Sequence, residues 1–401
     1  MEKKFKSIET GQKSIIPKVK GLSTLQVTVM AVAAGASVAN IYYNQPILKD
    51  IATTFNVNES KAGSISMLSQ IGYGIGLFFL IPLGDKTDKK KLILLLLMLL
   101  CVALGLITFS QNITQVWILS VAIGILSVSV HVIVPMAASL DKMNRGKTIG
   151  HIFTGILIGI LAARVCSGFI ARWLGWRYVY GFSTVLILSI TLLLHLTLPT
   201  VKTEFKGRYL QLLQSTLLQI KRFPLLREAA VTGGLLFGVF CSFWTTLTFH
   251  LSGYPFYYHA DKIGMFGLVA IAGALLAPYF GKIADKGGAK KSLVLAVSLI
   301  IFSLFLIKLL PYSTVSFVIA VLILDIGVQA MQVTNVARIY TLDENSYSRI
   351  NTIYMTTYFI GGALGTFTGL TCWRIGGWSI TTWQMLVWSF IAMIIILKSK
   401  K

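Results

Sequence analysis

The feature that most constrains this chain is a series of twelve long apolar segments. A helix rises about 1.5 Å per residue, so about 20 apolar residues cross the roughly 30 Å of hydrocarbon in a bilayer. A helix also pairs its own backbone amides, which lipid cannot do. The sequence therefore predicts an all-α polytopic membrane protein. The predicted spans are residues 25–43, 62–82, 92–109, 116–140, 149–170, 179–198, 229–251, 263–280, 293–310, 315–336, 353–373 and 380–397.

The distribution of charge predicts an orientation. Only 12% of the 401 residues are charged, against roughly 25% in an average soluble domain. The net charge of +22 raises the alternative of nucleic-acid binding, but 28 of the 36 lysines and arginines lie in the tails and in alternate loops. By the positive-inside rule, both termini are expected to be cytoplasmic in a bacterial plasma or inner membrane. The basic side chains are then expected to face lipid headgroups rather than nucleic acid.

A long polar stretch divides the apolar segments into six and six. The turn after the second span of each half is acidic and then basic, with Asp85 and Asp285 lying 200 residues apart. Internal repeats of this kind are typical of transporters whose substrate site lies between the halves near the membrane midplane. The predicted parts are a cytoplasmic tail at 1–24, a six-helix bundle at 25–198, a cytoplasmic linker at 199–228, a second bundle at 229–397 and a tail at 398–401.

These paired turns resemble the signature of the major facilitator superfamily, G-x-x-x-D-(R/K)-x-G-(R/K)-(R/K). The second copy keeps both glycines, whereas Ile81 and Asp88 occupy those positions in the first. The resemblance covers essentially the whole chain and implies two pseudo-symmetric six-helix bundles, a monomer and alternating access. It implies a cytoplasmic gate, although any cytoplasmic turn gathers lysines for topology alone. The gate candidates are Asp85, Lys86, Lys89, Lys90, Asp285, Lys286, Lys290 and Lys291.

Three ionisable residues lie near the middle of predicted spans, where insertion scales assign a charge a cost of about 2.5–3.5 kcal/mol. Asp325 shares a helix face with Gln329 and Gln332, at i+4 and i+7. Because a polar stripe on an apolar helix faces a cavity and protonation would neutralise the carboxylate, Asp325 is the leading proton-coupling candidate. His131 is the second candidate. For both residues the alternative is a structural hydrogen bond between packed helices.

Arg164, the third ionisable residue, is also a coupling candidate. Its guanidinium keeps its proton and so must be paired, hydrated or bound to an anion. The glycine spacing around it resembles the antiporter motif of family exporters, G-x8-G-x3-G-P-x2-G-G, with Ala163 and Arg164 in place of Gly and Pro, and implies export. Small residues also allow close helix packing. The packing candidates are Gly155, Gly159, Ala163 and Gly168 and, in the eleventh span, Gly361, Gly362 and Gly365.

Polar and aromatic side chains within the spans are candidates for lining a substrate cavity. Aromatic rings suit stacking on an apolar or cationic substrate, and they also serve as packing or interfacial residues. The sequence blocks at the end of the first span and at 358–365 resemble a bacterial branch of drug-exporter-like facilitators. The cavity candidates are Asn40, Tyr43, Asn44, Gln70, Tyr73, Trp244, Gln329, Gln332, Tyr354 and Tyr358.

The sequence predicts a transporter rather than an enzyme. It contains no G-x-x-x-x-G-K-[ST] nucleotide loop and no metal-ligand spacing, so no cofactor is expected and an ion gradient is the expected driving force. The prediction is proton-coupled efflux, by antiport, of a drug-like compound or metabolite, with protons, a small molecule and the lipid bilayer as partners. The alternatives are a proton-coupled importer of a sugar or organic anion and, outside transport, a membrane receptor or channel.

Overall fold

The computed structural model describes residues 21–141, 143–199, 208–270, 288–343 and 346–399. Among these residues, ten helices are long and apolar enough to cross a membrane. One of the ten, α14 (Tyr347–Lys398), contains two predicted spans in 52 residues. Long apolar helices therefore dominate the fold, as the hydropathy pattern predicts.

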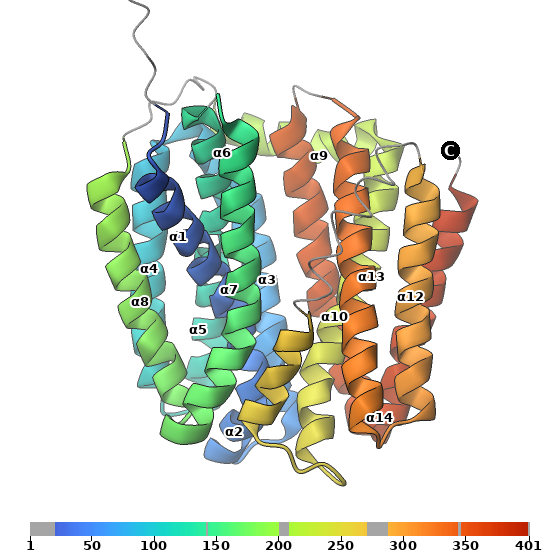
Figure 1. Cartoon of the computed structure of the whole chain (residues 1–401). Helices are drawn as coiled ribbons and strands as arrows, with labels where there is room; N and C mark the ends of the chain where they lie inside the picture. The colour runs from blue at the N-terminus through green and yellow to red at the C-terminus, as the bar shows by residue number, and fades with distance from the viewer. Residues whose placement is uncertain (1–20, 142, 200–207, 271–287, 344–345, 400–401) are drawn as a thin grey trace, which may run out of the picture.

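The first half of the molecule comprises the helices that lie side by side on the left of Figure 1. The short helix α2 (Asn44–Thr54) follows α1 (Thr24–Tyr42) at the lower end of this half. The other members are α3 (Glu59–Lys86), α4 (Lys89–Thr108), α5 (Ile113–Leu126), the 3-10 turn η1 (Ser127–Ser129), α6 (Val130–Leu140), α7 (Arg145–Leu174) and α8 (Trp176–Thr197).

The second half lies on the right of Figure 1, with α9 (Tyr209–Arg222) near the upper ends of the helices. Of the eighth predicted span, the structure describes the helix at residues 260–270, and the remainder lies outside the described residues. The other members are α10 (Pro224–Ser252), α12 (Ala289–Leu309), α13 (Thr314–Tyr340) and α14.

Three elements differ in detail from the predicted spans. The fourth span is interrupted by η1, between α5 and α6. In α14 the helix geometry breaks only at Gly376 and Gly377, where Gly377 takes a φ of 60°, a conformation that suits a residue without a Cβ. α10 begins at Pro224, before the apolar stretch that starts at 229, because proline is favoured in the first helical turn.

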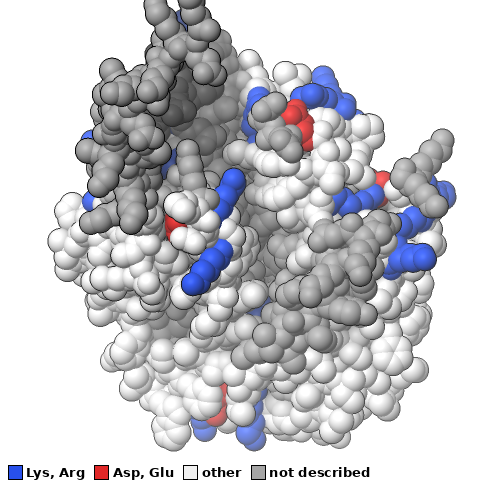
Figure 2. All heavy atoms as spheres, turned by 45° about the horizontal axis from the view of Figure 1, so that its top comes forward, with Lys and Arg blue, Asp and Glu red and all other residues white. Residues whose placement is uncertain are grey.

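The two ends of the bundle differ in charge. The described chain begins and ends at the same end of the bundle, which we call the terminal face, and α2 lies at the other end, the opposite face (Figure 1). Figure 2 shows lysine and arginine side chains gathered over both halves on the terminal face. This placement agrees with the alternation of basic loops along the sequence.

Glycines bring helix backbones into direct contact in both halves. A Cβ atom on Gly155 or Gly159 of α7 would collide with the carbonyl oxygen of Ala31 or Gly35 of α1. In the second half, a Cβ on Gly361 or Gly365 of α14 would collide with a carbonyl oxygen of α10. The first and fifth spans of one half thus pack as the first and fifth spans of the other do, and small residues permit this approach.

Contacts between the two halves extend from the opposite face toward the centre. Trp373 of α14 donates to Glu59 of α3 over 2.8 Å, and Thr248 of α10 donates to the Gln45 carbonyl over 2.8 Å. A Cβ on Gly168 of α7 would collide with the Ala260 carbonyl oxygen. These contacts hold the halves together on the side away from the chain termini.

Candidate functional site

Arg164 lies at the interface between the halves and is almost completely buried, with 1% of its surface exposed. Its Nε donates to Gln45 Oε1 over 2.8 Å. Its guanidinium carbon lies 4.0 Å from the ring centroid of Trp244, on α10 of the other half. The NH2 atom of this guanidinium has no hydrogen-bond partner. The site therefore contains a fixed positive charge with an unused donor.

Two further aromatic rings flank the guanidinium. Its carbon lies 5.0 Å from the ring centroid of Tyr42 and 5.6 Å from that of Phe240. A cation over an aromatic face is attracted by the negative potential of the ring. Stacking of this kind, together with the bond to Gln45, fixes the orientation of Arg164 in an otherwise apolar environment.

Asp325 approaches the same place from α13. Its side chain is buried, and Oδ2 has no hydrogen-bond partner. Its charge interacts with that of Arg164, yet no ion pair within 4.0 Å joins the two among the described residues. The structure thus brings two of the three midplane ionisable residues toward each other, one from each half, and leaves both incompletely satisfied.

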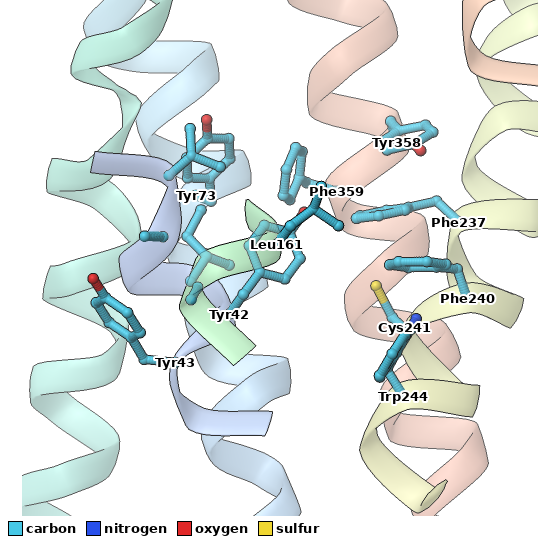
Figure 3. Packing of buried hydrophobic residues seen from close by; sticks show 14 of the residues in the cluster. Tyr42, Tyr43, Tyr73, Leu161, Phe237, Phe240, Cys241, Trp244, Tyr358 and Phe359 are labelled. Atoms are coloured by element: carbon cyan, nitrogen blue, oxygen red, sulfur yellow. The ribbon is translucent and has the colours of Figure 1, made fainter. Parts of the chain in front are cut away.

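An aromatic layer crosses the interface (Figure 3), and two of its rings, Phe240 and Trp244, lie against the Arg164 guanidinium. Tyr73 of α3 and Phe359 of α14 have ring centroids 4.2 Å apart. On the second half, Phe237 stacks on Tyr358 with centroids 4.0 Å apart, and Phe240 and Trp244 continue the same face of α10. An apolar or aromatic molecule could replace ring contacts of this kind without leaving polar groups unpaired.

His131, the third midplane ionisable residue, belongs to this layer rather than to the charge pair. Its Nε2 lies 2.9 Å from the Tyr73 hydroxyl. The ring contact between Tyr73 and Phe359 connects this pair to the second half. His131 therefore contacts the second half through Tyr73, which lies between the histidine and Phe359.

The polar residues at the end of the first span point into their own half. Asn40 accepts from Ser183 of α8 over 2.7 Å, and Asn44 accepts from Ser66 of α3 over 2.6 Å. Tyr43 lines an apolar cavity of about 580 Å³ formed by α1, α7 and α8. Ala163 lines this cavity as well. Among the described residues, none of Asn40, Tyr43 and Asn44 forms a hydrogen bond with Arg164.

Of the remaining cavity candidates, Gln70 lies at the contact between the halves, whereas the others lie on α13 and α14 of the second half. Gln70 of α3 accepts from Thr366 of α14 over 3.0 Å. Gln332 lies 3.4 Å from the Tyr358 hydroxyl, while Gln329, one turn earlier on α13, is half-buried. Tyr354 is fully buried one turn before Tyr358. Gly362 of α14 packs against the Phe237 ring.

The gate candidates are placed only in part. Asp285 and Lys286 lie outside the described residues, as does the side chain of Asp85. Lys90 donates to carbonyl oxygens of His195 and Leu198 at the end of α8. Lys86, Lys89 and Lys291 lie at helix ends on the terminal face.

Several residues at the centre were not singled out from the sequence. Gln45 is one of them, because an amide in a mixed segment has no distinctive spacing. Phe237 and Phe240 are two more. Together with Trp244, which the sequence did single out, they recur at i, i+3 and i+7, the spacing of one helix face, and this pattern could have identified the aromatic layer. Tyr42 is not distinguishable from Tyr43 without the structure.

Comparison with known proteins agrees with this architecture. The sequence profile of the Major Facilitator Superfamily matches residues 30–366, which is most of the chain. The chain belongs to the major facilitator superfamily. Members of this superfamily are transporters rather than enzymes, so the chain is a secondary transporter of a small molecule, with the predicted all-helical, multi-pass membrane fold.

Related transporters occur in several bacteria. The chain is 36% identical over 359 residues to the uncharacterized transporter YgaY of Escherichia coli O157:H7, covering 89% of this chain and 91% of YgaY. It is 26% identical over 352 residues to a Streptomyces coelicolor protein described as "Probable transporter SCO4007", with coverage of 87% and 82%.

Two solved structures share the fold at low identity. The POT family transporter PepTSo superimposes with a TM-score of 0.71 at 13% identity, covering 93% of this chain and 96% of that one. A bacterial homologue of the lysosomal transporter Spinster, in an inward-facing and unoccupied conformation, gives a TM-score of 0.69 at 14% identity, with coverage of 94% and 96%. At these identities the similarity concerns the facilitator fold alone.

Proposed function

We propose that this facilitator is a proton-coupled exporter whose substrate site lies between its two halves. In this proposal the terminal face is cytoplasmic, the bundles at 25–198 and 229–397 move relative to each other, and the segment at 199–228 links them. The concentration of basic side chains on the terminal face supports the orientation. The contacts between the halves from the centre to the opposite face support an arrangement closed toward the outside.

The unpaired carboxylate of Asp325 is the observation that carries the proposal. It lies on α13 in an apolar interior and interacts with the charge of Arg164 on the other half. A carboxylate in such a place is costly when ionised and unpaired, whereas its protonated form is neutral. Proton binding therefore changes the free energy of bringing the halves together, which is what coupling requires.

Two observations bear on the substrate and the direction. The rings of Phe237, Phe240, Trp244 and Tyr358 provide an apolar wall suited to a drug-like compound or metabolite. The glycine spacing in α7 resembles that of family antiporters, which favours export. The second candidate function is import of an organic anion, because Arg164 offers an unused donor and a permanent charge.

The test is proton movement in sealed proteoliposomes with an imposed pH gradient, challenged with lipophilic cations, sugars and organic anions. We expect at least one class to dissipate the gradient with wild type, and Asp325→Asn to abolish this while retaining substrate exchange at saturating substrate concentration. Asp88→Asn is the matched control, because Asp88 caps α4 outside the membrane and asparagine caps equally well. Unchanged uphill transport by Asp325→Asn would refute the coupling role.

A further inference from the structure

The guanidinium of Arg164 is held in place, but its hydrogen-bonding capacity is not fully used. Nε is bound to Gln45, one face of the group is covered by Trp244, and NH2 is buried without a partner. A buried donor left without an acceptor is unfavourable, and more so when it carries charge. Since the guanidinium keeps its proton, an acceptor supplied by a ligand would complete the site, and a carboxylate matches its planar geometry.

Asp325 presents the complementary situation. Its Oδ2 is buried without a donor, and α13 carries it on the second half, whereas α7 carries Arg164 on the first. The two charges interact without forming an ion pair among the described residues. An ammonium group would supply the donors that Asp325 lacks.

We propose that Arg164 and Asp325 are the two ends of one substrate site, which binds a small amino carboxylate with an apolar body. The carboxylate lies against Arg164 NH2 and the ammonium against Asp325 Oδ2. The apolar body packs on the rings that face the interface, Phe240 and Trp244. The proposal rests on the proposed transport function and names its substrate class.

Such a ligand also suits the electrostatics of the interface. A zwitterion is neutral overall, so the filled site keeps the charge balance of the empty site while each buried charge gains a partner. The partners belong to opposite halves, so the ligand itself bridges the surfaces that separate during transport. A simple anion would satisfy only Arg164, and a simple cation only Asp325.

The experiment compares three probes that differ by one group: L-phenylalanine, 3-phenylpropionate without the amine, and 2-phenylethylamine without the carboxylate. Binding to the purified, detergent-solubilised full chain is measured by calorimetry and by the shift in Tm. We expect phenylalanine to bind at least about tenfold more tightly than either analogue, because each analogue leaves one buried charge unpaired.

Variants assign each end of the ligand. Arg164→Gln is expected to abolish the preference for phenylalanine over 2-phenylethylamine, and Asp325→Asn the preference over 3-phenylpropionate. Arg177→Gln is the matched control, because Arg177 also stacks on a tryptophan, with its guanidinium carbon 4.4 Å from the Trp176 ring centroid, but lies within the first half. Arg164→Lys retains the charge and provides a folded comparison if Arg164→Gln does not melt cooperatively.

Several outcomes would overturn the proposal. They are equal binding of the three probes by wild type, tightest binding of 3-phenylpropionate, unchanged preferences in Arg164→Gln and Asp325→Asn, or binding of none of the probes. Failure of this proposal is distinguishable from failure of the proposed transport function. If lipophilic cations drive proton release through wild type while amino carboxylates neither bind nor exchange, the substrate class is wrong and proton-coupled export stands.

Discussion

Lys90 and Lys290, 200 positions apart, have equivalent partners in the two halves. Lys90 Nζ lies 2.8 Å from the His195 carbonyl oxygen near the end of α8. Lys290 Nζ lies 2.9 Å from the Leu397 carbonyl oxygen at the end of α14. Each lysine therefore neutralises the negative end of the last helix of its own half. The repeat in the basic turns thus has a structural basis within each half.

This relationship predicts that Lys90→Gln and Lys290→Gln lower stability rather than alter gating. We expect each to cost about 0.3–1 kcal/mol, the usual range for a cation at a helix C-terminus, seen as a lower Tm in detergent. Lys91→Gln and Lys291→Gln are the matched controls. A shift in cysteine accessibility between the two faces without any change in Tm would instead favour a latch between the halves.

The backbone contacts between α1 and α7 predict opposite effects for two glycines of α7. Gly159→Ala forces the helices apart, and overpacking of this kind costs about 1–3 kcal/mol. Gly150→Ala meets open space, with nothing within 4 Å of the added Cβ, and gains up to about 1 kcal/mol of helix propensity. Thermal melting of the two purified variants measures the difference. Equal Tm values would contradict the close packing.

Asp50, on α2 near the opposite face, predicts a pH dependence. Burial raises the pKa of its carboxyl above the ordinary value of 3.8, while His259 and Arg172 act in the other direction. The arrangement that buries Asp50 has the higher pKa and so binds the proton more tightly than one that exposes it. The buried arrangement is therefore stabilised relative to the exposed one as the pH falls through the raised pKa. If separation of the halves exposes Asp50, acid favours closure at the opposite face.

Spin labels at Phe109→Cys and Tyr312→Cys, on the two halves near this face, can measure that closure. We expect the short-distance population to increase as pH falls from 7 toward 4.5, and Asp50→Asn to remove the dependence. His259→Gln serves as the control for the other titratable group facing Asp50. A pH response that persists in Asp50→Asn and vanishes in His259→Gln would assign it to the histidine.

The sequence predicts the spans well because the length of an apolar run has a direct physical meaning in a bilayer. It predicts Asp325 and Arg164 for the same reason, since charges in lipid are costly. It cannot predict that these two approach each other, because they lie on different helices of different halves. The contacts of side-chain amides are harder still to predict. Asn40 and Gln45 look alike in sequence, yet Gln45 binds Arg164 whereas Asn40 binds Ser183.

The two-glycine turn within α14 has a practical consequence. At Gly376 and Gly377 the chain reverses between its last two spans without an intervening polar loop. A protease, antibody or inserted affinity tag therefore finds little backbone to engage there. The segment at residues 253–259, which joins α10 to the next helix and includes exposed Tyr254 and Tyr257, is the better place to attach a handle on that side of the membrane.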